Sequence, residues 1–386
     1  MLIVAEILTD QARCNGNRSI CHGSLKLLDG IFLLLLDLRT SLVDNGICLS
    51  LSLSGDLLFE SVAGELGIVE DLLSLGFCTL ELLTILSQKS FAFLSCLNPG
   101  DEIIVPEPAY ANYMAFAISA GAKIRTIATT IEEGFSLPKV EKFEQLINER
   151  TRAILICNPN NPTGYLYTRR EMNQIRDLVR KYDLYLFSDE VYREFIYTGS
   201  PYISACHLDG IEQNVVLIDS FSKRYSECGI RIGALITKNA EVRQAVMKFC
   251  QARLSPPLIG QLVAEASLDA PDEYTREVYD EYVERRKCLI DGLNRIPGVY
   301  SPIPMGAFYT VARLPVDSAE RFCAWCLEEY EYEGQTVMMA PASGFYTTPG
   351  AGTDQVRIAY VLRKEDLERA LVVLRKALEA YPGRIE

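Results

Sequence analysis

This 386-residue chain has few histidines and no long hydrophobic run. With only His22 and His207, we expect neither a histidine-based metal site nor a serine–histidine triad. No apolar stretch reaches the roughly 18 residues of a membrane-spanning helix, and Met1 to Asp10 lacks the basic start of a signal peptide. Basic residues number 38 against 51 acidic ones, which argues against nucleic acid or an anionic membrane as a partner. We therefore expect a cytoplasmic protein whose partners are small molecules or other proteins.

The 12 cysteines are scattered without a repeating spacing, in a chain too long to need a disulfide framework. Cys323 and Cys326 form a C-x-x-C pair, but they lie in residues 318–334, where apolar residues recur at helical spacing. No second cysteine pair or histidine cluster stands nearby in the sequence. Packing on a helix face is therefore the favoured interpretation over a metal or redox role, and we expect no metal.

Proline and tyrosine are absent from residues 1–97, although the whole chain has 17 and 20 of them. Leucine and serine dominate this region instead, and residues 31–36 read IFLLLL, with neither helical nor strand periodicity. The amino-acid composition and the hydrophobic pattern change at about Phe91. We interpret residues 1–90 as an aberrant N-terminal segment, and our hypothesis is that it is translated from a shifted reading frame; a genuine divergent N-terminus is the competing account.

From about Phe91 onward, apolar strands alternate with amphipathic helices. Strands are expected at 101–108, 123–129, 152–164 with its closing turn, 183–192 and 214–223, and helices at 110–120, 139–150, 168–182 and 277–296. Such alternation predicts right-handed β-α-β units and a largely parallel sheet. The expected fold is α/β, with a large domain of a mostly parallel sheet flanked by helices at 91–285 and a smaller α+β domain at 286–386.

Three of these strands end in polar residues. Ligands bind beyond the carboxyl ends of parallel strands, so these ends are expected to share one site. Asn161 follows the first, in NPNNPTG, and Asp189 and Tyr192 follow the second, in SDEVY. Taken alone, the first reads as an ordinary turn and the second as a solvated acid.

The third strand runs directly into Ser220, Ser222 and Lys223. Small hydroxyl residues and backbone N–H groups can donate hydrogen bonds to a phosphate, and the Arg231 guanidinium can add two charge-assisted hydrogen bonds. A lysine beside a phosphorylated ligand can become nucleophilic towards a carbonyl when desolvation and nearby cations lower its pKa. Asp189 adds a carboxylate that can pair with a ring nitrogen. Together these groups match what pyridoxal 5′-phosphate needs from a protein: phosphate donors, an amine for its aldehyde and a carboxylate for its ring nitrogen.

The motifs NPNNPTG, SDEVY, SFSKRYSECGIRIG and VRIAY stand in the order of a known family. From about Phe91 to the C-terminus the chain resembles a class I aminotransferase of the aspartate aminotransferase family, fold type I. The resemblance implies that Lys223 bonds the cofactor aldehyde and shuttles the substrate Cα proton, and that Asp189 pairs with the pyridine nitrogen. It also implies that Asn161 and Tyr192 hydrogen-bond the ring 3-oxygen.

For the remaining site residues the resemblance implies roles in binding the cofactor or the substrate. Ser220, Ser222 and Arg231 hold the phosphate, and Tyr110 stacks on the cofactor ring. Arg357, with Asn161, binds the substrate α-carboxylate through two parallel hydrogen bonds. Gly306 matches a family glycine that allows close backbone approach near the substrate.

The chain departs from the family upstream of Phe91. A Gly-Gly-Ser/Thr turn that binds the phosphate is replaced by Thr84, Ile85 and Leu86. The family tyrosine that reaches into the neighbouring subunit is also missing, since no tyrosine precedes Tyr110.

The expected activity is transfer of an amino group from an L-amino acid, aspartate-like or other, to a 2-oxo acid such as 2-oxoglutarate, by a ping-pong mechanism in a homodimer. Two alternatives stay open: a C–S lyase on the same scaffold, and a catalytically impaired relative that lacks a complete phosphate cup. Arg253 could face a second substrate carboxylate, although a structural role is favoured.

Overall fold

The computed structural model describes residues 88–199 and 201–385. The expectations about residues 1–90 and about the turn at Thr84 to Leu86 therefore lie almost wholly outside the described residues. The described part belongs to one compact unit. None of its helices is long and apolar enough to cross a membrane.

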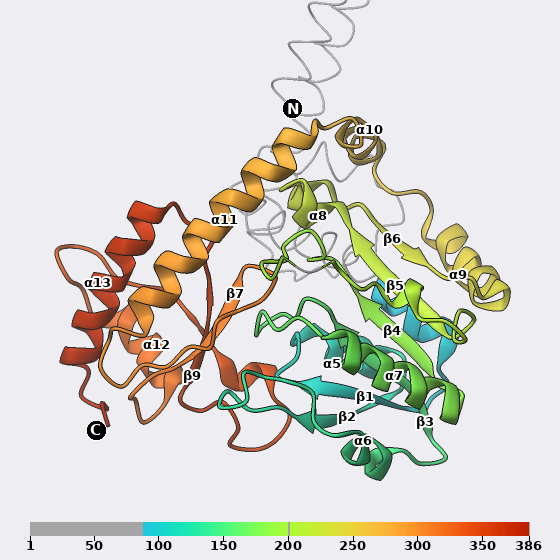
Figure 1. Ribbon diagram of the computed structural model, residues 1–386, viewed down its shortest axis with the longest axis horizontal. Helices are drawn as coiled ribbons and strands as arrows, with labels where there is room; N and C mark the ends of the chain where they lie inside the picture. The colour runs from blue at the N-terminus through green and yellow to red at the C-terminus, as the bar shows by residue number, and fades with distance from the viewer. Residues whose placement is uncertain (1–87, 200, 386) are drawn as a thin grey trace, which may run out of the picture. The chain divides into compact units, whose positions relative to one another are not determined.

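A six-stranded sheet forms the centre of the larger part of the unit (Figure 1). Its order is β2-β1-β3-β4-β5-β6; the first five strands are parallel, and β6 is antiparallel to β5. The strands are β1 (Glu102–Glu107), β2 (Lys123–Ala128), β3 (Thr151–Cys157), β4 (Tyr185–Asp189), β5 (Val215–Ser220) and β6 (Gly233–Ile236). The expected α/β class with a mostly parallel sheet is thus confirmed.

Helices cover both faces of this sheet, which explains the nearly continuous apolar strands. Alternate residues of a strand enter different cores: Ile154 packs with the buried face of α7 (Arg169–Tyr182), whereas Leu155 packs with Phe93 of the helix at residues 88–96. The other helices of this part are α5 (Asn112–Ser119), α6 (Val140–Leu146), the short α8 (Phe221–Arg224), α9 (Ala240–Arg253) and α10 (Leu258–Ser267).

The start of α7 shows how local sequence sets an element boundary. The Thr168 hydroxyl accepts a hydrogen bond from the Glu171 amide at 3.2 Å, and the Glu171 carboxylate accepts one from the Thr168 amide at 2.8 Å. This reciprocal capping box satisfies two amides that the first helical turn leaves free. The helix ends at Tyr182, and the next residue, Asp183, adopts a left-handed conformation with φ of 49°.

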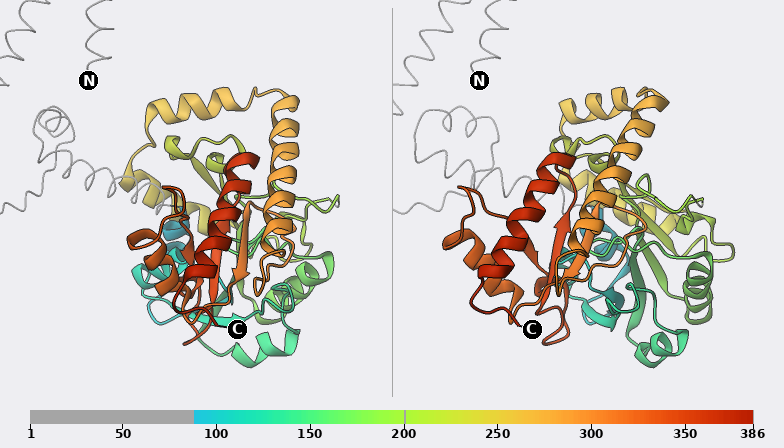
Figure 2. Two further views of the ribbon diagram at one scale, coloured as in Figure 1. Left: turned by 90° about the vertical axis from the view of Figure 1, so that its left-hand side faces the viewer. Right: turned by 60° about the vertical axis from the view of Figure 1, so that its left-hand side comes forward.

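A second, three-stranded antiparallel sheet follows in the chain, with the order β7-β9-β8. Its strands are β7 (Tyr309–Arg313), β8 (Ala340–Pro341) and β9 (Gln355–Ala359), and its helices are α11 (Asp272–Leu293), α12 (Ala319–Glu328) and α13 (Lys364–Ala380). α11 and α13 lie side by side (Figure 2). Because α11 runs through residue 285, the boundary between a large and a small domain stays a prediction.

Cys323 and Cys326 pack in the core on α12, as the helical spacing indicated. Burial raises the pKa of the Cys323 thiol to about 11 and that of Cys326 to about 12. Both thiols are therefore protonated at neutral pH, which fits a packing role rather than a reactive one.

Two glycines bring the smaller sheet against the loop after β3. The amides of Met305 and Gly306 both donate to the Gly164 carbonyl at 2.9 Å. A Cβ on Gly306 would lie 2.6 Å from Pro159 Cβ, so this position has no room for a side chain, and the expected approach to the substrate stays a prediction. A Cβ on Gly164 would lie 2.4 Å from Pro304 Cβ and 2.6 Å from the Tyr309 carbonyl oxygen.

We expect Gly164→Ala to lower the free energy of unfolding more than Gly134→Ala does. Both glycines have positive φ, 69° and 62°, but a Cβ on Gly134 would meet nothing within 4 Å. The left-handed conformation alone costs about 1–2 kcal/mol for alanine, and overpacking at Gly164 adds roughly 1–3 kcal/mol. Urea unfolding of both variants measures the difference, and equal losses would contradict this account.

Candidate active site

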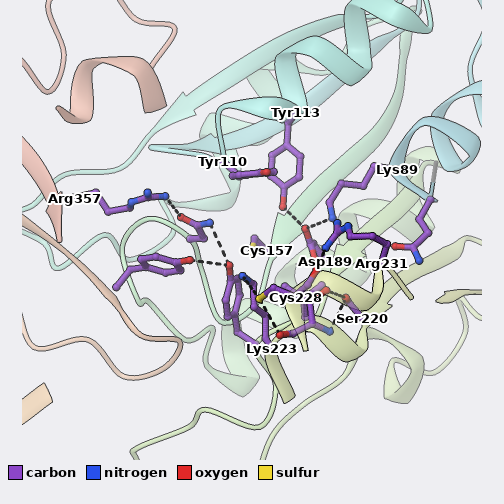
Figure 3. A pocket seen from close by; sticks show the side chains of 16 residues that line it. Lys89, Tyr110, Tyr113, Cys157, Asp189, Ser220, Lys223, Cys228, Arg231 and Arg357 are labelled. Atoms are coloured by element: carbon purple, nitrogen blue, oxygen red, sulfur yellow. Dashed lines mark hydrogen bonds and ion pairs between the residues drawn. The ribbon is translucent and has the colours of Figure 1, made fainter. Parts of the chain in front are cut away.

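The carboxyl ends of three neighbouring strands open onto one cavity of about 380 Å³ (Figure 3). β3 leads into the loop with Asn161, β4 ends at Asp189, and β5 leads into Lys223. The cavity is lined by every residue expected to hold cofactor or substrate: Tyr110, Asn161, Asp189, Tyr192, Ser220, Ser222, Lys223, Arg231 and Arg357. The structure thus brings together residues that are up to 247 positions apart (357 − 110) in the chain.

Asp189 is a buried carboxylate at the cavity wall, with only 3% of its surface exposed. Its Oδ2 accepts a hydrogen bond from the Tyr113 hydroxyl at 2.7 Å and lies 3.1 Å from the Lys89 ammonium. Its Oδ1 is buried and has no hydrogen-bond partner among the described residues. A buried carboxylate oxygen without a donor is unfavourable, so Asp189 retains the capacity for one more proton donor.

Glu190, the next acid in the SDEVY motif, does not line the cavity. Its Oε1 accepts hydrogen bonds from the Ser188 hydroxyl at 2.9 Å and from the Ala205 amide at 2.8 Å. Burial raises the pKa of this carboxyl above its usual value. Successive side chains of a strand point to opposite faces, which explains why the neighbouring acids have separate surroundings.

Lys223 lies on α8, whose first turn is organised by the two serines before it. The Ser220 Oγ accepts from the Ser222 amide at 3.1 Å, and the Ser220 hydroxyl donates to Ser222 Oγ at 2.9 Å. The Lys223 Nζ lies 3.7 Å from Cys228 Sγ and 5.8 Å from the centre of the Phe308 ring. The half-buried ammonium therefore faces the cavity with its apolar stem packed.

A chain of hydrogen bonds connects the polar side chains on the opposite wall of the cavity. The Arg357 guanidinium donates to Asn161 Oδ1 at 3.3 Å, the Asn161 amide donates to the Tyr192 hydroxyl at 3.4 Å, and that hydroxyl donates to Tyr309 at 3.3 Å. Arg357 also lies over the rings of Tyr309 and Phe345, at 4.8 and 4.9 Å. These contacts hold the guanidinium at the cavity while leaving donors for an anion.

Burial raises the pKa of the Tyr192 phenol well above its usual value, and the neighbouring Tyr309 adds to this effect. Burial likewise raises the pKa of Tyr110, whose ring meets Tyr113 edge-on with centroids 5.4 Å apart. Both phenols are therefore neutral hydrogen-bond donors at pH 7.

Lys89 and Tyr113 contact Asp189 but were missed in the sequence analysis. Tyr113 stands three residues after Tyr110, so the helical spacing could have placed both on one face of a helix. Lys89 lies on the helix at residues 88–96, just before the change in composition at Phe91, and belongs to no recognisable sequence motif.

Arg253, considered above as a contact for a second carboxylate, is the last residue of α9 and does not line this cavity. It lines a different one, together with Gln88, Phe91 and Arg231. A structural role for Arg253 fits this position better.

We expect Tyr113→Phe to destabilise the protein by about 1.5–3 kcal/mol, because it removes a buried hydrogen bond to a charged acceptor. Tyr360→Phe is the matched control: Tyr360 is equally buried and donates to the Ala307 carbonyl at 3.1 Å, a neutral acceptor worth about 1 kcal/mol. Denaturant unfolding compares the two, and a larger loss in the control would contradict the charged state of Asp189.

Comparison with known proteins agrees with this geometry. Residues 87–374 match the family model described as aminotransferase class I and II. The "Putative aminotransferase YugH" of Bacillus subtilis is 32% identical, over 74% of this chain and 72% of that protein. An "Aspartate aminotransferase" of Pyrococcus horikoshii is 31% identical, over 75% of this chain and 72% of that protein.

Solved structures agree as well. An alanine aminotransferase from Pyrococcus furiosus has a TM-score of 0.69 and 30% identity, covering 77% of this chain and 75% of that chain. The aspartate aminotransferase from Thermus thermophilus with maleate has a TM-score of 0.68 and 27% identity, covering 75% of this chain and 73% of that chain. The fold, the cavity and the family match together establish that this chain belongs to the class I and II aminotransferases and is a transferase enzyme.

Proposed function

We propose that the protein is a pyridoxal 5′-phosphate-dependent aminotransferase that moves the amino group of an L-amino acid, aspartate-like or other, to a 2-oxo acid such as 2-oxoglutarate by a ping-pong mechanism. The observation that carries the proposal is the placement of Lys223 and the buried Asp189 on one cavity. The homodimer implied by the family resemblance and the cytoplasmic location expected from the sequence composition belong to the same proposal.

The residues of the cavity fit this cofactor. The carboxylate of Asp189 has one oxygen, Oδ1, without a hydrogen-bond partner among the described residues, so it has capacity for the proton that a ring nitrogen would donate. Ser220, Ser222 and Arg231 gather on the same cavity and offer hydroxyl and guanidinium donors for a phosphate. Lys223 supplies the amine for an aldehyde.

When bound, pyridoxal 5′-phosphate supplies an electron sink for the pair left when the substrate Cα–H bond breaks. Asp189 would hold the ring nitrogen in its protonated form through a charge-assisted hydrogen bond. The Tyr192 hydroxyl and the Asn161 amide would donate to the ring oxygen, and Tyr110 would pack on the ring. Lys223 Nζ acts as the base that accepts the Cα proton and returns it within the cavity.

The substrate is held by Arg357, whose planar guanidinium matches the α-carboxylate of an amino acid or a 2-oxo acid. Its contact to Asn161 Oδ1 links the carboxylate site to the site of the ring oxygen, since the other end of that amide faces Tyr192. Binding the carboxylate in this way orients the Cα–H bond towards Lys223.

We expect Lys223→Ala to abolish the cofactor absorbance band and to lower transamination by at least about 10³-fold, because it removes the general base and the amine that bonds the aldehyde. Lys248→Ala, at an exposed position of α9, is the control and should match the unaltered protein. Product analysis separates the reactions: glutamate formed from added 2-oxoglutarate supports a transaminase, whereas pyruvate and ammonia released without it would indicate a lyase.

Arg357→Lys should raise KM for both substrates about 10–100-fold, because an ammonium cannot form the two parallel hydrogen bonds and each bond to a charged group contributes roughly 1.5–3 kcal/mol. The cofactor absorbance should stay unchanged. Arg363→Lys, at an exposed residue just before α13, serves as the control. An unchanged KM in Arg357→Lys would remove this residue from the substrate site.

A further inference from the structure

Lys89 is a second lysine of the cavity, and the proposed function gives it no task. Its Nζ lies 3.1 Å from Asp189 Oδ2, with side-chain exposures of 11% for the lysine and 4% for the aspartate. Figure 3 shows Lys89 pointing from the helix at residues 88–96 into the cavity and towards the Asp189 carboxylate. The pair is thus buried at the position where the proposed function needs a ring nitrogen.

Neither oxygen of Asp189 is open to a ligand in this arrangement. Oδ2 already contacts the Tyr113 hydroxyl and the Lys89 ammonium. Oδ1 has less than 1 Å² of exposed surface, so a ring N–H cannot reach it without a side chain moving. Tyr113 is 2% exposed and fixed on α5, whereas Lys89 has a long, rotatable side chain. The group that can make way is therefore the lysine.

Charge leads to the same conclusion. A buried carboxylate requires one compensating cation, and Lys89 supplies it in the protein without ligand. A protonated ring nitrogen supplies the same charge. Two cations in contact with one buried carboxylate would repel each other in a weakly screened site. The two cations are therefore expected to occupy Asp189 alternately.

We propose that Lys89 competes with the cofactor for Asp189, so that cofactor loading exchanges the lysine ammonium for the ring-nitrogen cation. This inference rests on the proposed function and adds a control on cofactor affinity by a residue of the chain itself. The competition raises the apparent Kd, since only the fraction of molecules with Lys89 turned away from Asp189 can bind the cofactor fully.

The test measures the Kd of pyridoxal 5′-phosphate for the full chain and two variants, after cofactor removal. Lys89→Met keeps the apolar stem and removes the charge, and it should bind the cofactor about tenfold more tightly. Lys89→Arg keeps a cation for Asp189 and should bind like the unaltered chain. Cofactor-free Lys89→Met should also melt at a lower temperature, because Asp189 loses its compensating charge, and should gain more on loading.

Binding is counted only where borohydride reduction and peptide mapping place the cofactor on Lys223. Equal or weaker binding by Lys89→Met would overturn the inference and leave the proposed function standing. A label found on Lys89 instead of Lys223 would overturn both. Absence of binding by all three chains would overturn both. If Lys89→Met does not fold, Lys89→Gln, whose amide can still donate to Asp189, carries the same expectation.

Discussion

The buried negative charge of Asp189 is the constraint on which the site depends. Folding places this carboxylate at the end of β4 with 3% of its surface exposed, which is unfavourable unless donors and a cation surround it. Tyr113 supplies a donor and Lys89 a cation, and one oxygen still has no hydrogen-bond partner among the described residues. The site therefore pairs one buried carboxylate with one cation, a place that a protonated pyridine ring would take over from Lys89 under the proposed function.

The architecture serves this site in two ways. Parallel strands β3, β4 and β5 lie side by side and deliver Asn161, Asp189 and Lys223 to one edge of the sheet. The smaller sheet adds Arg357 from β9, and its approach is fixed by backbone contacts between Gly164 and Gly306 that leave no room for side chains. The cavity is therefore complete only when the two sheets keep their relative position.

Much of this arrangement follows from sequence. The parallel strands are buried on both faces, so their apolar runs are strong signals, and the polar residues after them are visible as strand ends. All nine expected site residues line one cavity.

β6 and the helices α9 and α10 were not expected from the sequence. β6 has four residues and is too short to show a period, and α9 and α10 bury few side chains. Asp189 and Glu190 both follow the apolar run at residues 184–187 within three positions, and only the family resemblance selected Asp189. The contact of Lys89 with Asp189 depends on a helix docking against a sheet, for which no local pattern exists.

A crystal structure of the full chain grown with pyridoxal 5′-phosphate would test the central claim most directly. The account predicts the ring nitrogen within about 2.6–3.2 Å of an Asp189 oxygen, the aldehyde carbon bonded to Lys223, and Lys89 turned away from the carboxylate. A ring bound elsewhere, or bound here with its nitrogen away from Asp189, would contradict the claim that this buried carboxylate organises the site.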